Sequence, residues 1–159
     1  MERIFIFIVI TLFVYTIIPT MMIRLFGIAV YKKGTTAHSI ALTFDDGPDP
    51  EYTSRLLDLL KQHNVKATFF VLGLKAKQYP ELIKQMHHEG HLVGVHNYVH
   101  GANAFMTPKR VRLQVNNTVD VIDRIIGERP IYYRPPGGII NIFDFLLLKN
   151  FRKVIPHYL

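Results

Sequence analysis

The sequence contains no cysteine among its 159 residues. Disulfide bonds and thiolate metal sites are therefore excluded, and any metal site must use histidine nitrogens and carboxylate oxygens. Clusters of lysine and arginine, aromatic stacking motifs and zinc-finger patterns are also missing. The formal net charge of +7 comes from scattered basic residues, so a generally basic envelope protein is the simpler interpretation and no nucleic-acid partner is expected.

Charge is missing altogether from residues 4–23. An uncharged apolar run of about 20 residues can cross a bilayer as a helix. Because the run ends without a small-x-small cleavage site, an uncleaved anchor is favoured over a cleaved signal peptide. We predict an N-terminal transmembrane signal anchor over residues 1–24 and a juxtamembrane linker over residues 25–38.

From residue 39 to residue 159, apolar strand patterns alternate with helical ones, which predicts an α/β domain with parallel strands and helices packed outside them. An open doubly wound sheet and a barrel both remain possible on periodicity alone. We expect strands at Ile40–Phe44, Ala67–Leu72, His91–Val95, Ile131–Tyr133 and Arg152–Ile155. Helices are expected from Asp49 and Pro50 onward, over Pro80–Glu89, from Thr107 to Gly127, and over Ile142–Leu148.

Polar residues gather where these strands end. Asp45 and Asp46 follow the first strand, His96 and His100 follow the third, and Arg134 follows the fourth. Because the carboxyl ends of parallel strands meet at one rim, these side chains should converge there.

The residue types suit metal-assisted hydrolysis. Two histidines four residues apart can share one face of a helical turn and bind a single cation. Consecutive residues leaving a strand point in different directions, so one of Asp45 and Asp46 can bind metal while the other serves as a base. Arg134 would orient that base through an ion pair. Each pattern alone is also a common turn, helix-surface or loop sequence, and their joint occurrence at successive strand ends favours a catalytic site.

Three ordered motifs carry a family resemblance. The runs Thr43–Pro48, His96–His100 and Arg134–Gly138 resemble the first three motifs of the NodB-homology polysaccharide deacetylases, also called carbohydrate esterase family 4. The stretches Lys66–Phe70 and Glu89–Gly94 resemble the family's second strand and its lead into the histidine motif. The resemblance covers about residues 39 to 140.

This resemblance implies an incomplete NodB-type distorted (β/α) barrel, preceded here by the one N-terminal transmembrane helix. It implies that Asp45 is the catalytic base, that Arg134 positions this base, and that Zn²⁺ or another divalent metal ion is bound by Asp46, His96 and His100. The implied reaction removes acetyl groups from a cell-wall or chitin-like N-acetylglucosamine polymer. Such a substrate favours a single-pass protein of the cell membrane with an extracytoplasmic domain, although Arg24, Lys32 and Lys33 weakly favour the opposite orientation.

Two departures from the family pattern bear on activity. Asn97 stands where the family usually has Ser or Thr, which is expected to alter the hydrogen bonds of the histidine loop. The sequence ends 21 residues after Gly138, and the family's later Asp/Trp stretch and its Leu-x-His segment with the general acid histidine are not found. The alternative hypothesis is therefore an inactive or unstable truncated deacetylase, acting at most as a membrane-tethered glycan- or metal-binding module with an exposed apolar sheet edge.

Overall fold

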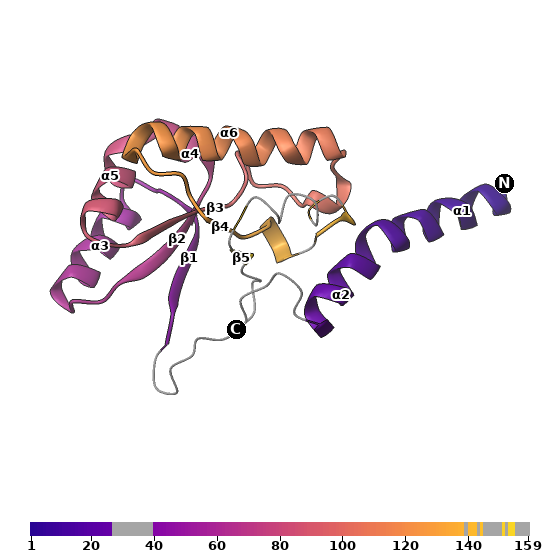
Figure 1. Ribbon diagram of the computed structural model, residues 1–159, viewed down its shortest axis with the longest axis horizontal. Coiled ribbons are helices and arrows are strands. Elements are labelled where there is room, and N and C mark those ends of the chain that lie inside the picture. The colour runs from indigo at the N-terminus through magenta and orange to yellow at the C-terminus, as the bar shows by residue number, and fades with distance from the viewer. Residues whose placement is uncertain (27–39, 139, 143, 145–150, 152, 155–159) are drawn as a thin grey trace.

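The computed structural model describes residues 1–26, 40–138, 140–142, 144, 151 and 153–154. Five short strands alternate with helices after an N-terminal helical segment (Figure 1). The strands are β1 (Leu42–Gly47), β2 (Ala67–Val71), β3 (Leu92–Val95), β4 (Tyr132–Tyr133) and β5 (Lys153–Val154). The helical elements are α1 (Glu2–Leu12), η1 (Phe13–Ile17), α2 (Ile18–Phe26), α3 (Tyr52–Gln62), α4 (Gly73–Gln78), α5 (Pro80–His88), η2 (Asn103–Phe105), α6 (Pro108–Ile126) and η3 (Pro136–Gly138).

The strand order distinguishes the two architectures that periodicity leaves open. The sheet runs β1-β2-β3-β4-β5, and every neighbouring pair is parallel. A doubly wound sheet reverses its strand order part-way, whereas an unbroken order with right-handed crossovers places all connecting helices on one face. The described sheet is therefore an arc of a (β/α) barrel, which confirms the predicted fold. At its first edge, Ile40 is 91% exposed and Leu42 is 40% exposed.

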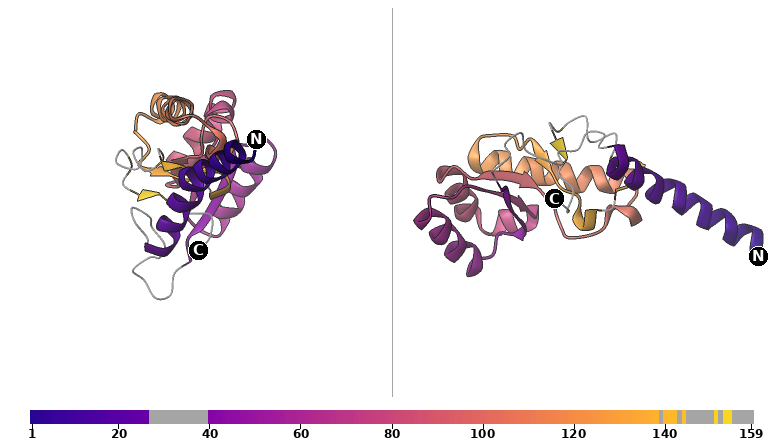
Figure 2. Two further views of the ribbon diagram at one scale, coloured as in Figure 1. Left: turned by 90° about the vertical axis from the view of Figure 1, so that its right-hand side faces the viewer. Right: turned by 90° about the horizontal axis from the view of Figure 1, so that it is seen from below.

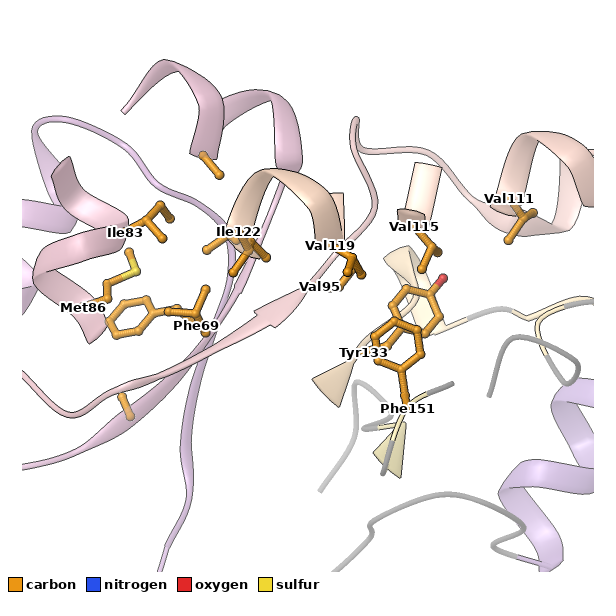
Figure 3. Packing of buried hydrophobic residues seen from close by; sticks show 14 of the residues in the cluster. Phe69, Ile83, Met86, Val95, Val111, Val115, Val119, Ile122, Tyr133 and Phe151 are labelled. Carbon is orange, nitrogen blue, oxygen red and sulfur yellow. The ribbon is translucent and has the colours of Figure 1, made fainter. Parts of the chain in front are cut away.

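The long helix α6 supplies much of the core. Its apolar positions at spacings of three and four residues, Val111, Val115, Val119 and Ile122, are all buried (Figure 3). Thr107 caps its start by accepting a hydrogen bond from the Arg110 backbone N–H at 3.4 Å. Gly127 ends it with φ of +73°, a left-handed conformation that glycine adopts without steric cost. Both ends lie where the sequence predicts them.

The described elements differ from the predicted ones at two boundaries and by one additional helix. Strand β1 continues past Phe44 to Gly47, because the residues after Phe44 still pair with β2. Pro50 precedes α3 rather than opening it, while Asp49 Oδ1 accepts hydrogen bonds from the backbone N–H groups of Glu51 and Tyr52 at 3.0 Å. The short helix α4 has too few residues to show an apolar stripe and is not predicted from the sequence. Most of the predicted helix over residues 142–148 lies outside the described residues.

The N-terminal segment has two parts with different surroundings. Glu2–Met22 forms one run of 21 helical residues with a mean hydropathy of 2.5, long and apolar enough to cross a membrane, a test that a signal sequence also passes. Figure 2 shows α1 projecting away from the domain, and none of its residues is buried. Pro19 cannot donate a backbone hydrogen bond to Tyr15, which accounts for the π-helical turn over Phe13–Ile17.

The following part contacts the domain. The Tyr15 hydroxyl donates a hydrogen bond to the Met106 carbonyl oxygen at 3.1 Å. Thr20 Oγ1 donates to the Ile140 carbonyl oxygen at 3.2 Å and accepts from the Ile140 backbone N–H at 3.3 Å. The helix continues to Phe26, and residues 27–39 lie outside the described residues, so the boundaries of the linker and the domain remain predictions.

Candidate metal and catalytic site

A bulge at the end of β1 separates the two neighbouring aspartates. Asp45 pairs with Phe70 of β2 and Gly47 pairs with Val71, so Asp46 is an extra residue in the ladder. Its φ of +66° turns the chain at this point. As a result the Asp45 side chain faces Arg134, while the half-exposed Asp46 side chain faces His96 and His100. Bulges re-aim side chains in this way at functional sites.

Arg134 holds Asp45 in a largely buried ion pair. Its Nη1 atom lies 2.7 Å from Asp45 Oδ1 and also donates a hydrogen bond to Thr43 Oγ1 at 3.0 Å. The side chains of Arg134 and Asp45 are only 5% and 15% exposed, so water screens this pair far less than a surface ion pair. The separation meets the sequence-based expectation of salt-bridge contact, while the catalytic roles of the two residues remain proposals.

An aromatic ring supports the guanidinium from one side. The Arg134 Cζ atom lies 4.3 Å from the centroid of the fully buried Phe70 ring. Gly94 on the adjacent strand makes room for that ring, since a Cβ atom at this position would lie 2.7 Å from Phe70. The position of the arginine is therefore determined by packing between β2 and β3 as well as by hydrogen bonds.

Asp46, His96 and His100 converge on one small volume. Asp46 Oδ1 lies 3.6 Å from the Nε2 atom of each histidine, and one ligand atom from each residue lies within 4.8 Å of the others. Ligand atoms bound to one Zn²⁺ ion at about 2.1 Å in tetrahedral geometry lie roughly 3.4 Å apart. The observed separations and the mixed imidazole and carboxylate donors therefore fit a divalent cation of this kind.

The main chain orients the buried histidine. His96 Nδ1 lies 2.7 Å from the carbonyl oxygen of Arg134, and because a carbonyl can only accept, Nδ1 carries the hydrogen. The other ring nitrogen, Nε2, is thereby directed toward Asp46. Histidines that bind metals are commonly held through their second nitrogen in this way.

Sequence reasoning misses several contributors. Lys75 Nζ donates to the Asp46 carbonyl oxygen at 2.8 Å, but it lies on α4, whose sequence carries no helical pattern. Thr43 could have been found, because it lies two residues before Asp45 on the same face of β1. Phe70 gives no signal beyond that of a core residue.

The remaining described histidines lie elsewhere. Among the described residues, Asp46, His96 and His100 are the one group of three or more potential ligands found close enough to share an ion. His91 is buried and its Nδ1 accepts from the Ala67 backbone N–H at 3.2 Å, and burial lowers the pKa of this imidazole. His87 lies 3.9 Å from Glu128. His157 lies outside the described residues.

Comparison with known proteins agrees with this arrangement. Residues 32–143 match the sequence profile of the family described as polysaccharide deacetylase. The chain belongs to the polysaccharide deacetylase family. A peptidoglycan-N-acetylglucosamine deacetylase of Bacillus cereus is 48% identical over 117 residues, which are 72% of this chain and 42% of that protein.

Solved structures of deacetylases share the fold. The Bc1960 peptidoglycan N-acetylglucosamine deacetylase, crystallised with a naphthalenyl N-oxidanyl-benzamide, has a TM-score of 0.70 and 42% identity, covering 72% of this chain and 54% of that one. A family 4 acetyl xylan esterase from Clostridium thermocellum, in complex with a cobalt ion, has a TM-score of 0.58 and 41% identity, covering 60% and 47%. This deacetylase-family chain thus spans about half, or less, of the length of these relatives.

Proposed function

We propose that this chain carries the metal-dependent hydrolase site of an enzyme that removes acetyl groups from an N-acetylated polysaccharide of the cell envelope. Peptidoglycan is the proposed substrate, with a chitin-like N-acetylglucosamine polymer as the related choice. The observation that carries the proposal is the placement of the Asp45–Arg134 ion pair beside the Asp46, His96 and His100 group on one rim of the sheet. The names of the relatives support the same reaction.

Asp46, His96 and His100 would hold Zn²⁺ or another divalent ion. When bound, such an ion supplies a Lewis acid for the amide carbonyl and lowers the pKa of water that attacks it. The cobalt ion in the related acetyl xylan esterase supports a metal in this family.

The other residues have distinct tasks. Asp45 would accept the proton of the attacking water, as a general base must lie within reach of the proton that it removes. Arg134, with Thr43, would keep one carboxylate oxygen of Asp45 engaged and the side chain in one orientation. Phe70 would exclude water from one side of the guanidinium.

The substrate also bears on location. Envelope polysaccharide lies outside the cytoplasm, so we place the domain on the extracytoplasmic side. The apolar N-terminal helix would attach it to the cell membrane as a single-pass anchor.

Metal titration of single variants tests the ligand assignment. Asp46→Asn, His96→Gln and His100→Gln should each lower the affinity for Zn²⁺ or Co²⁺ by about 100-fold or more in calorimetry, because each removes one direct ligand. His63→Gln is the matched control, since this exposed histidine follows α3 and lies outside the site. Unchanged affinity in any of the three ligand variants would contradict that assignment.

Acetate release tests the reaction itself. The metal-loaded chain is incubated with N-acetylglucosamine oligomers and with peptidoglycan, and Asp45→Asn should abolish the release of acetate while leaving metal affinity intact. A non-catalytic metal- or glycan-binding module is the rival proposal. Tight metal binding by the unaltered chain without acetate release would support this rival.

A further inference from the structure

A closed ring of buried hydrogen bonds lies beside the candidate metal loop. Asn97 Nδ2 donates to Asn103 Oδ1 at 2.7 Å, Asn103 Nδ2 donates to the Tyr133 hydroxyl at 2.6 Å, and that hydroxyl donates to Asn97 Oδ1 at 3.2 Å. All three residues are fully buried. Hydrogen bonds that run in one direction around a ring in a low-dielectric interior strengthen one another.

Two residues of the ring are joined through the backbone to the two parts of the site, the metal-ligand group and the Asp45–Arg134 ion pair. Asn97 directly follows His96, and its φ of +66° is a left-handed conformation that asparagine tolerates better than most residues. Tyr133 directly precedes Arg134, whose carbonyl oxygen holds His96 and whose side chain holds Asp45. A shift of the ring would therefore displace His96 and Arg134 together.

Asp144 connects this ring to the segment that follows the Arg-Pro-Pro-Gly-Gly run. Its Oδ1 atom accepts the second hydrogen of Asn103 Nδ2 at 2.7 Å. Its Oδ2 atom accepts from the Asn141 backbone N–H at 2.7 Å, and Asn141 Oδ1 accepts from the Asp144 backbone N–H at 3.1 Å. This reciprocal pair has the form of a capping box at a helix start.

A further contact fixes the same loop residue. Asn141 Nδ2 donates to the Asn103 carbonyl oxygen at 2.8 Å, so residues 141 and 144 hold both the main chain and the side chain of Asn103. Asp144 and Asn141 are themselves fully buried. A polar group in such a position is costly to leave without its hydrogen bonds, so the geometry of all five residues of the network is tightly determined.

We infer that Asn103 and Asp144 are positioning residues, which hold His96 and Arg134 in place through the ring formed with Asn97 and Tyr133. The inference builds on the proposed metal-binding function. It means that the affinity of the metal site depends on a side chain 44 residues beyond the nearest ligand along the chain, His100. It also gives Asn97, the departure from the family's Ser or Thr, a definite structural task.

The test exchanges the two polar groups of the Asn103–Asp144 contact. Asn103→Asp alone sets two carboxylates against each other, and Asp144→Asn alone leaves one of two donors without its acceptor. In the double variant, the amide introduced at 144 donates to the carboxylate introduced at 103 and still accepts from Asn141. The Tyr133 hydroxyl must then turn to donate to this carboxylate, because residue 103 no longer donates to it. Ile122→Ala is the matched control, since it opens the core along α6 and removes no side-chain hydrogen bond.

Co²⁺ titration of the full chain, well below each variant's Tm, is the first measurement. Each single variant should bind Co²⁺ roughly tenfold more weakly and change the visible absorption of the bound ion, as is usual for residues that orient ligands. The double variant should recover part of the affinity, because the contact between residues 103 and 144 is restored while the hydrogen bond from Tyr133 to Asn97 is lost. The Ile122→Ala control should lower Tm and leave both properties unchanged. Equal affinity in the unaltered chain and both single variants would overturn the inference.

Amide hydrogen exchange of the metal-free chain is the second measurement, and it does not depend on metal binding. Both single variants should exchange faster over residues 96–101, with partial recovery in the double variant, whereas unchanged exchange would overturn the inference. Tyr133→Phe, which removes one oxygen from the ring, provides the same comparison if a single variant does not fold. Failure of the unaltered chain to bind any metal would instead contradict the proposed function.

Discussion

His96 Nδ1 lies 2.7 Å from the backbone carbonyl oxygen of Arg134, the residue whose side chain lies 2.7 Å from Asp45. One residue therefore holds a candidate metal ligand with its main chain and the candidate base with its side chain. The two functions can be separated by mutation, because truncating the side chain leaves the carbonyl group in place.

Arg134→Ala should reduce acetate release by about 100-fold, since Asp45 loses the partner that orients it and general base catalysis contributes about that much or more. Metal affinity, measured by calorimetry, should change by less than about threefold, because Arg134→Ala removes no metal ligand. A threefold change in Kd corresponds to about 0.7 kcal/mol of binding free energy. Arg55→Ala is the control, as Arg55 makes an exposed ion pair with Glu51. Parallel loss of metal and activity in Arg134→Ala would contradict separate roles.

Gly94→Ala should destabilise the fold by about 1–3 kcal/mol, the usual cost of overpacking a core. The new Cβ would lie 2.7 Å from the Phe70 ring and 3.2 Å from the Tyr132 carbonyl oxygen. Because Phe70 supports Arg134, activity should fall along with the free energy of unfolding. Gly127→Ala, which meets nothing within 4 Å but has φ of +73°, should cost stability alone. Chemical denaturation and acetate assays on both variants distinguish these outcomes.

Stability should depend on pH through Asp144. Burial raises the pKa of this carboxyl from its ordinary value to about 6, opposed in part by its hydrogen bonds with Asn141 and Asn103. Between about pH 4 and pH 6 the folded chain therefore binds more protons than the unfolded chain, so the free energy of unfolding falls as pH rises, by at most about 3 kcal/mol. The stabilising contribution is present at low pH and is lost as pH passes through about 6.

Asp144→Asn should remove this part of the pH dependence. The measurement compares urea denaturation at about pH 4.5 and about pH 7 for the unaltered chain and the variant. Asp58→Asn, at an exposed position on α3, should keep the original difference. The same difference in all three proteins would mean that Asp144 does not titrate in this range.

Contact between the N-terminal helix and the domain can be trapped covalently. Thr20→Cys combined with Ile140→Cys should form a disulfide under mild oxidation, because the Thr20 hydroxyl lies 3.2 Å from the Ile140 carbonyl oxygen. The sequence has no other cysteine, so non-reducing electrophoresis reports this pair alone. Phe5→Cys with Ile140→Cys is the control, since Phe5 lies on the exposed helix α1. Equal rates for the two pairs would contradict the contact.

Local patterns predict those parts of the fold that local physics determines. The stripe from Val111 to Ile122 and the stop at Gly127 give α6 its face and its end, and the structure has both. Periodicity cannot distinguish a barrel from an open sheet, because that difference lies in the order of strands. Strand order arises from tertiary pairing, and each strand carries the same apolar pattern in either architecture.

The candidate site also combines residues that local sequence patterns identify with residues that only tertiary contacts reveal. Asp45, Asp46, His96, His100 and Arg134 are found from sequence because they follow strands directly and parallel strands end on one rim. Asn103 and Lys75 are not, because their roles depend on contacts between distant elements and neither lies in a motif. The bulge at Asp46 also has no recognisable sequence pattern, although it determines which aspartate faces the histidines.

The contacts of Tyr15 and Thr20 with the domain limit how much of the proposed membrane anchor is free to enter a bilayer. A helix of 21 residues such as Glu2–Met22 is roughly 32 Å long at about 1.5 Å per residue. This length only slightly exceeds the thickness of a bilayer's hydrocarbon core, which is roughly 30 Å. With Tyr15 and Thr20 bound to the domain, the exposed helix α1 of 11 residues covers only about half of that distance. As the proposed membrane anchor, this helix could not be fully inserted while Tyr15 and Thr20 remain bound to the domain. In the proposed anchored state, a thicker bilayer would favour release of the helix from Met106 and Ile140, and a thinner one would favour retention of those hydrogen bonds.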